Sequence, residues 1–314
     1  MAKELVDALV PIFAGLLLGF WAGRRGLMDN FNVRNLIALV MNIAAPCALF
    51  LIINNTSRAI LQQQIWTSLA ITLTFAVLYI GCYFWARRNT NSVSESAVIA
   101  LTFAFPNEAA IAVSLLTTTY GHGAAVPGAL SIAIGAVAIS PVTLALLEVD
   151  SQGKATTIGV RTLAGGVVRS LTRPIIWAPA LALVLVSIGI HIPDYVASTL
   201  GLIGGAAAGG ALLLTGLILS AQPFTLNGPV LVISFAKLIL QPMLAFGIAL
   251  AMPVSHQQVR DITLISAIPG GFFGIVFGKS FNTIPEVASS GLIATYGLAI
   301  VTLPLWIFLL SRFM

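Results

Sequence analysis

The sequence has little charge, little cysteine and little histidine, and each scarcity excludes a class of protein. Charged residues are 8% of the 314 positions, whereas a soluble domain carries about 25%, so a water-soluble fold is excluded. The two cysteines, Cys47 and Cys82, lie inside apolar runs, which argues against a disulfide framework or redox chemistry. The three histidines, His122, His191 and His256, fall in predicted outer loops, and their spacing predicts no metal site.

The sequence also lacks the motifs that enzymes and nucleic-acid-binding proteins use. It contains no nucleotide-binding loop, no zinc spacing, no paired catalytic carboxylates and no serine near a histidine within an apolar run. We therefore predict no enzyme, and no cofactor beyond a coupled proton or sodium ion. The net charge of +5 comes from basic residues scattered along loops, so it indicates membrane topology and not a nucleic-acid partner.

Apolar runs dominate the chain instead. Hydrophobic residues are 58% of the sequence and the mean hydropathy is +1.01, which predicts an all-α membrane protein in contact with a lipid bilayer. At roughly 20 residues per span, about ten transmembrane helices fit. The expected spans cover residues 5–22, 33–53, 66–86, 100–121, 126–147, 174–190, 199–220, 229–252, 261–277 and 288–310.

Basic residues are unevenly divided between the two sides of this arrangement. With the N-terminus outside, ten lie on the inner side, namely Arg24, Arg25, Arg34, Arg87, Arg88, Lys154, Arg161, Arg169, Arg173 and Lys279. Four lie on the outer side, namely Lys3, Arg58, Arg260 and Arg312. Because inner loops carry the excess of Lys and Arg, both termini are predicted to be periplasmic or extracellular.

Prolines recur at a fixed offset between the two halves of the chain. Three in the first half precede three in the second by 163 positions each: Pro11 and Pro174, Pro106 and Pro269, Pro141 and Pro304. This recurrence predicts two five-helix repeats, residues 1–150 and 174–314, joined by a cytoplasmic linker at 151–173. Because five is odd, the second repeat enters the membrane from the opposite side, which makes it an inverted repeat.

Two of the matched prolines interrupt the fourth and ninth spans. Pro106 is followed by Asn107 and Glu108, and Pro269 is followed by Gly270 and Gly271. Proline removes a backbone donor and clashes with the preceding turn, and glycine weakens a helix interior. Interrupted spans at corresponding positions of two repeats predict a midplane binding site where they cross. The N-terminal ends of the half-helices favour an anion there.

Five polar residues within spans are further candidates, each with an alternative role. Asn107 either donates its amide to a substrate carboxylate or caps the interrupted backbone. Glu108 is either a proton carrier or a bonded carboxylate at the cavity wall. Lys237 either stands where other carriers bind a cation or extends to the interface. Asn42 and Gln241 either line the cavity or bond across helices. Together with Glu108 and Lys237, Gln241 is also a candidate for ion coupling.

Several motifs resemble those of the auxin efflux carrier superfamily of transporters, over essentially the whole chain. They are Leu18–Gly23, Ala45–Phe50, Phe105–Asn107, Lys237–Pro242 and Gly270–Gly278. The first and last of these, with Asp29–Asn30 and Asn32–Val33, are most similar to the bacterial malonate transporter branch. The resemblance implies a location in the bacterial inner membrane.

The resemblance also implies a fold and a site. Helices 1, 2, 6 and 7 would form a scaffold, and helices 3–5 and 8–10 a transport domain that moves like an elevator within a homodimer. Substrate carboxylate binding maps onto Asn107, Pro106 and Pro269. This chain departs from the family pattern at two positions. Some relatives have a polar residue where this chain has Gly270. Some have an aspartate near the position of Asn42, and asparagine, unlike aspartate, cannot carry a proton.

Three functions compete at this point. The leading one is a secondary active carrier of a small carboxylate, with malonate the best single expectation. The second is a cation/proton antiporter of similar two-break architecture, for which the interrupted spans offer the carboxyl of Glu108. The third is a membrane sensor that binds an anion without moving it. Counterflow of substrate separates the first from the third.

Overall fold

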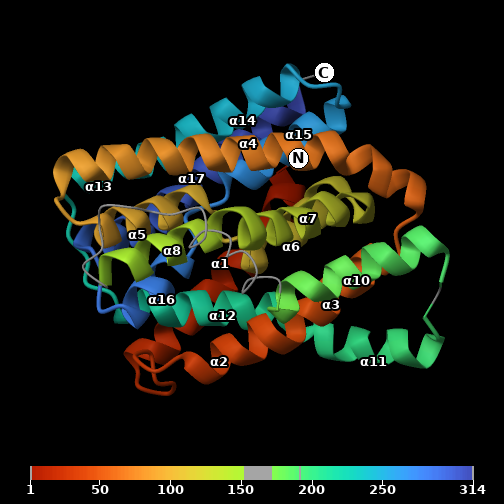
Figure 1. Ribbon diagram of the computed structural model, residues 1–314, viewed down its shortest axis with the longest axis horizontal. Helices are drawn as coiled ribbons and strands as arrows, with labels where there is room; N and C mark the ends of the chain where they lie inside the picture. Colours follow the sequence, from red (N-terminus) through yellow and green to blue (C-terminus); the bar gives the residue numbers. More distant parts are fainter. Residues whose placement is uncertain (1, 152–171, 191, 313–314) are drawn as a thin grey trace. The chain divides into compact units, whose positions relative to one another are not determined.

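The regular structure of the chain is helical, as its hydropathy predicts (Figure 1). The computed structural model describes residues 2–151, 172–190 and 192–312, and within these ranges it contains no strand beyond one isolated bridge. The all-α fold class is thus confirmed. Most of the predicted linker, with Lys154, Arg161 and Arg169, lies outside the described residues, as does His191.

Within the described ranges, most helices follow one another with short connections. In chain order they are α1 (Ala2–Arg24), α2 (Arg34–Leu39), η1 (Val40–Ala44), α3 (Ala45–Asn54), α4 (Arg58–Asn89), α5 (Val93–Ala104), α6 (Glu108–Tyr120), η2 (His122–Ala124), α7 (Ala125–Ile134), η3 (Gly135–Ile139), α8 (Ser140–Ser151), α10 (Pro174–Ile188), α11 (Asp194–Gly204), α12 (Ala206–Ala221), α13 (Gly228–Phe235), η4 (Ala236–Leu240), α14 (Gln241–Leu250), α15 (His256–Ala267), α16 (Phe273–Ser280) and α17 (Glu286–Arg312).

Seven helical segments in the described ranges are long and apolar enough to cross a membrane. They are Val6–Arg24, Arg34–Asn54, Arg58–Asn89, Ala125–Ser151, Asp194–Ala221, Gly228–Leu250 and Glu286–Arg312. Each coincides with one of the ten predicted spans, so the chain is a multi-pass membrane protein. The sixth span corresponds to the shorter apolar helix α10, and the fourth and ninth are each divided between two helices. The count of ten therefore stays a prediction.

Helical structure stops at the prolines of the predicted fourth and ninth spans. The α5 helix ends at Ala104 and α6 begins at Glu108, while α15 ends at Ala267 and α16 begins at Phe273. Proline cannot donate the backbone bond that would carry each helix onward. A shift of 163 residues carries the bounds of α5 onto those of α15. The inverted repeat that this correspondence suggests stays a prediction.

Both of these spans begin earlier than their apolar runs predicted. The α5 helix starts at Val93, because Ser92 caps it by accepting a hydrogen bond from the Glu95 N–H at 3.1 Å. The α15 helix starts at His256 behind a capping box formed by Ser255 and Gln258. Their first turns are polar, so hydropathy placed the starts too late, whereas capping residues mark them directly.

Three other prolines are accommodated without interrupting a helix. A wide π-helical turn precedes each of them by the same spacing: η1 before Pro46, η3 before Pro141 and η4 before Pro242. A proline clashes with the carbonyl four residues earlier, and a π-bulge gives that carbonyl room. The segments around these turns therefore continue as single rods, as α13, η4 and α14 do in Figure 1.

The chain divides into two compact units. One comprises Met1–Ser68, Glu108–Ala133 and Leu171–Ala221, and the other comprises Leu69–Asn107, Ile134–Ser170 and Gln222–Met314. The first unit holds α1 to α3, α6 and α10 to α12, and the second holds α5, α8 and α13 to α17. The division of the ten helices into scaffold and transport domain stays a prediction.

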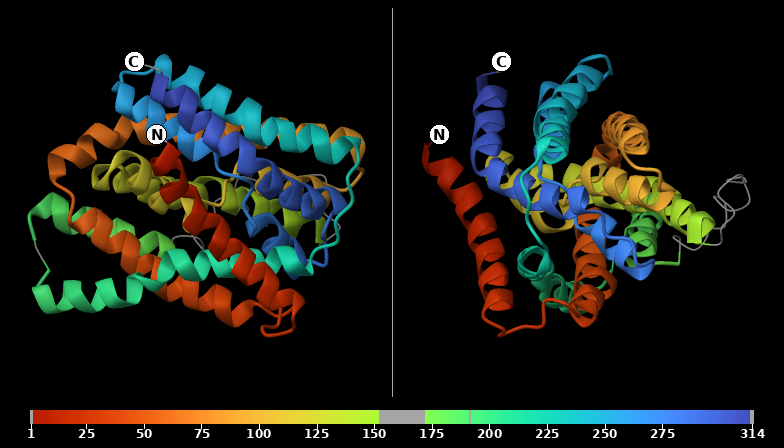
Figure 2. Two further views of the ribbon diagram at one scale, coloured as in Figure 1. Left: turned by 180° about the vertical axis from the view of Figure 1, so that it is seen from behind. Right: turned by 90° about the vertical axis from the view of Figure 1, so that its left-hand side faces the viewer.

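Within the first unit, α1 and α12 pack backbone to backbone, and α3 lies beside α10 (Figures 1 and 2). A Cβ added to Gly19 would lie 2.1 Å from the Leu213 carbonyl oxygen, and one added to Gly216 would lie 2.0 Å from the Leu16 carbonyl oxygen. Small residues allow this approach between membrane helices. Glycine is therefore required on both sides of the α1–α12 contact.

Replacing Gly216 with alanine is expected to separate α1 from α12 and to destabilise the protein by about 1–3 kcal/mol or more, because backbone atoms cannot rotate away from the added methyl. Thermal unfolding of the detergent-purified protein measures the loss. Gly209→Ala is the matched control, since nothing lies within 4 Å of a Cβ there on the same helix. Equal melting temperatures for the two variants would contradict the packing.

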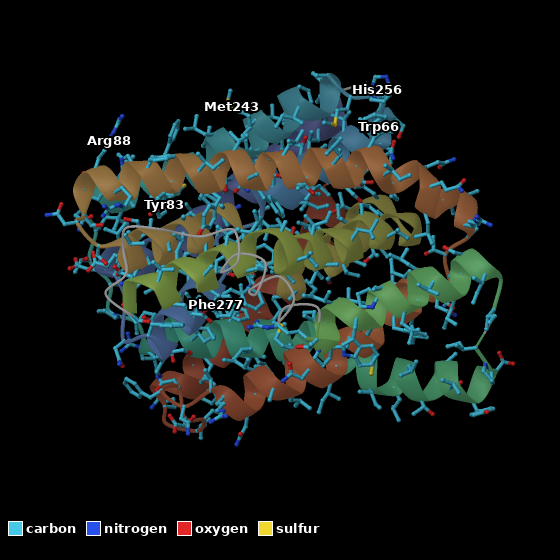
Figure 3. The ribbon with its side chains drawn as sticks, in the orientation of Figure 1. Trp66, Tyr83, Arg88, Met243, His256 and Phe277 are labelled. Atoms are coloured by element: carbon cyan, nitrogen blue, oxygen red, sulfur yellow. The ribbon has the colours of Figure 1, made fainter. Side chains whose placement is uncertain are left out.

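Large apolar side chains remain exposed along the outer faces of the helices. Leu17 on α1 is 66% exposed and Val301 on α17 is 69% exposed. Met243 on α14 points away from its helix in Figure 3 and is 55% exposed. A soluble protein rarely leaves so many large apolar residues in water, whereas lipid is their normal surroundings in a membrane helix.

Candidate functional site

The two helix interruptions of the second unit contact each other through their backbones. The Asn107 N–H donates to the Pro269 carbonyl at 3.0 Å, and the Gly271 N–H donates to the Thr102 carbonyl at 2.9 Å. Pro106 and Gly270 form the one isolated antiparallel bridge of the described residues. Five residues predicted to bind substrate, namely Pro106, Asn107, Pro269, Gly270 and Gly271, are therefore brought together.

Glycine is needed at the second interruption because the backbones approach so closely. A Cβ on Gly271 would lie 2.4 Å from the Phe105 carbonyl oxygen, and one on Gly270 would lie 2.8 Å from the Thr102 carbonyl oxygen. Any larger residue would push the interruptions apart. Steric fit against α5 thus explains glycine at position 270.

The side chain of Asn107 is held by the last helix. It is fully buried, and its Nδ2 donates to the Tyr296 hydroxyl on α17 at 2.6 Å. The neighbouring Thr295 hydroxyl accepts from the Gly270 N–H at 3.3 Å and donates to the Leu292 carbonyl at 2.8 Å. One turn of α17 thus supports both interruptions.

Thr295 and Tyr296 were missed by sequence reasoning. The available signal was a pair of adjacent polar residues inside the span, with no counterpart at the 163-residue offset. Thr102 was missed as well, although its carbonyl is the one that Pro106 leaves without its helical donor. All three are buried in the structure.

An aromatic cluster closes the site on one side. The ring of Phe105 stacks on that of Phe273, with centroids 5.4 Å apart and planes 15° apart, and its centroid lies 6.1 Å from that of Phe75. A Cβ on Gly135 would lie 2.0 Å from the Phe105 ring, so this glycine makes room for it. The stacking fixes the residue before Pro106.

A lysine and a glutamine occupy the C-terminal ends of the half-helices. Lys237 on η4 is fully buried, and its Nζ donates to Gln241 Oε1 and, at 3.1 Å, to the Ser266 carbonyl in the last turn of α15. Gln241 Nε2 donates to the carbonyl of Ala104, the last residue of α5, at 3.0 Å. The ammonium is therefore bonded inside the protein and does not extend to the interface.

Glu108 and Asn42 belong to the first unit. Glu108 is the first residue of α6 and is 1% exposed; a carboxylate there is favoured by the positive end of the helix dipole. Asn42 lies on the π-helical turn η1, and its side chain is exposed.

The arrangement offers hydrogen-bond donors to an acceptor. The Gly270 and Gly271 N–H groups already donate to Thr295 and Thr102. The α16 helix, however, has Phe272 as its N-cap and no side-chain cap hydrogen bond. The positive end of its dipole therefore favours an anionic oxygen at its first turn.

Comparison with known proteins identifies the family of the chain. The family model described as "Membrane transport protein" matches residues 4–307. The chain is 30% identical over 318 residues to the uncharacterized transporter YfdV of Escherichia coli strain K12, covering 98% of each protein. Proteins of the same name from Escherichia coli O157:H7 and Shigella flexneri match equally well. The chain therefore belongs to the membrane transport protein family, the auxin efflux carriers that its motifs resemble, and is a transporter and not an enzyme.

Proposed function

We propose that the protein is a secondary active transporter of a small organic anion, with a carboxylate as substrate and malonate as the best single candidate. The observation that carries this proposal is the direct contact between two interrupted helices, with the buried amide of Asn107 beside it. Interrupted membrane helices that meet in this way are the usual form of a transporter's binding site.

The donors at the site support an anionic substrate. Asn107 supplies a side-chain amide, and the first turn of α16 supplies backbone N–H groups at the positive end of its dipole. A carboxylate accepts several such bonds at once. The choice of malonate depends on the similarity of Leu18–Gly23 and Gly270–Gly278 to the malonate transporter branch.

The proposed mechanism is alternating access by an elevator-like movement. The residues around Asn107 and Gly270 are buried in this conformation, so the site must become accessible for substrate to enter and leave. We infer ten helices in two inverted repeats, with the fourth and ninth crossing; the matching bounds of α5 and α15 support this topology. A homodimer in the bacterial inner membrane with periplasmic termini completes the proposal.

Uptake of radiolabelled malonate into proteoliposomes tests the function. Vesicles that contain the purified protein and are preloaded with unlabelled malonate are expected to accumulate label by counterflow, and protein-free vesicles are not. Unlabelled malonate outside should compete, while a neutral ester of malonate should not, because it lacks the carboxylate. Accumulation equal to that of protein-free vesicles would sink the choice of malonate as substrate.

A cation/proton antiporter is the second candidate. Two buried carboxyl groups favour it: Glu108 is 1% exposed, and Asp261 on α15 is 3% exposed and accepts from Gln257 at 2.9 Å. Such a carrier would dissipate a preset pH gradient when sodium or potassium is added to vesicles without any organic anion. The carboxylate carrier predicts no such response. An anion sensor, the third candidate, would bind malonate without counterflow.

A further inference from the structure

The network of Lys237 and Gln241 joins the two half-helices that precede the interruptions. A helix leaves its last four carbonyls without helical donors. Here one such carbonyl in each half-helix accepts a hydrogen bond from a side chain of the same helical segment, Gly228–Leu250. Lys237 donates to the Ser266 carbonyl of α15, and Gln241 donates to the Ala104 carbonyl of α5. The two donors lie one turn apart, and the Lys237 ammonium also donates to the Gln241 amide oxygen.

Paired C-terminal ends of this kind attract cations. Each carries about half a negative charge, and in carriers with interrupted helices such ends, together with unwound carbonyls, coordinate the coupling sodium ion. In this protein a fully buried ammonium lies at that position, on the wide turn η4 that precedes Pro242. Its partners Gln241 Oε1 and Ser266 O are oxygen acceptors of the type that bind a metal cation.

We propose that Lys237 is a built-in cation that replaces a coupling metal ion, so that transport proceeds without sodium. This inference rests on the proposed function, since it concerns the coupling of that transport. Gln241 connects the ammonium to the second half-helix by hydrogen bonds: its amide oxygen accepts from Lys237, and its amide nitrogen donates to the Ala104 carbonyl. Lys237 is accordingly a positioning residue, because its hydrogen bonds to Gln241 and Ser266 hold both interruptions in register.

The proposal predicts that removing the charge creates a cation requirement. Wild-type protein is expected to take up malonate equally in sodium chloride and choline chloride of the same ionic strength. Lys237→Ala opens space for an ion beside the Gln241 and Ser266 oxygens. Its uptake is expected to fall about tenfold or more in choline and to recover saturably with sodium.

Thermal unfolding supplies a readout that needs no substrate. Lys237→Ala should melt about 5 °C or more below the wild type in choline and regain part of that loss as sodium is added. Lys237→Gln keeps a donor of similar reach without the charge, and it serves if the alanine variant does not fold. Lys237→Arg retains the charge, and its melting temperature should not depend on sodium. Lys279→Ala is the control, because Lys279 is exposed in the last turn of α16.

Two results would overturn the inference. One is a sodium requirement of the wild-type protein, in uptake or in melting temperature. The other is an uncharged Lys237 variant that folds and behaves identically in sodium and choline. If wild-type vesicles take up no malonate, the choice of substrate fails, and the melting temperatures still decide whether Lys237 replaces a metal ion.

Discussion

Asn107→Ala is expected to lower malonate uptake about 100-fold, which corresponds to the loss of one buried hydrogen bond to a charged group. The amide is fully buried at the contact of the two interruptions, so water does not replace its donor in this conformation. Uptake into proteoliposomes at matched protein density measures the effect, and size-exclusion chromatography checks that the variant is folded.

Tyr296→Phe separates substrate binding from support of the interrupted backbone. Asn107 Nδ2 donates to the Tyr296 hydroxyl in this conformation. If Asn107 only supported the backbone, removing that hydroxyl would lower uptake as much as removing the amide. If the amide binds substrate, Tyr296→Phe retains most uptake while Asn107→Ala does not. Equal loss in the two variants would assign Asn107 a capping role only.

Gly274→Ala is expected to destabilise the protein and to abolish uptake. A Cβ there would lie 2.1 Å from the Thr102 hydroxyl and 2.5 Å from the Val98 carbonyl oxygen, both on α5. Because the carbonyl belongs to the helix backbone, α16 must move away from α5. We expect a loss of about 3 kcal/mol or more, together with loss of uptake, since Gly270 and Gly271 would move with α16.

Gly297→Ala is the matched control for this prediction. It lies on α17, is exposed, and has nothing within 4 Å of an added Cβ. Alanine there should be neutral or stabilising by up to about 1 kcal/mol, as in other helix interiors. Chemical denaturation of both variants in one detergent compares them, and a Gly274→Ala protein as stable as Gly297→Ala would refute the α5–α16 contact.

The sequence predicted the helices and the two interruptions because both depend on local chemistry. Proline at 106 and 269 lacks the backbone N–H that would continue the helix, and glycine at 270 and 271 disfavours helix in the residues that follow. The ends of α5 and α15 therefore followed from residue type. The starts of these helices were placed too late, since hydropathy does not register the polar caps at Ser92 and Ser255.

The partners of the site residues depend on distant parts of the chain and could not be predicted. Tyr296 is 189 residues from Asn107, and no periodicity or offset connects them. The sequence alone is consistent with a Lys237 side chain at the membrane interface and with one in the protein interior. Its burial depends on its hydrogen bond to the Ser266 carbonyl, and no local pattern shows that α15 packs beside the segment that holds η4.

Titration calorimetry with malonate tests the central claim most directly, which is that the contact of the two interruptions binds a small carboxylate. Purified wild-type protein in detergent is expected to bind malonate saturably at one site per chain. Folded Asn107→Ala protein is expected to give no binding heat at the same concentrations. Equal affinity in the two proteins would contradict the account.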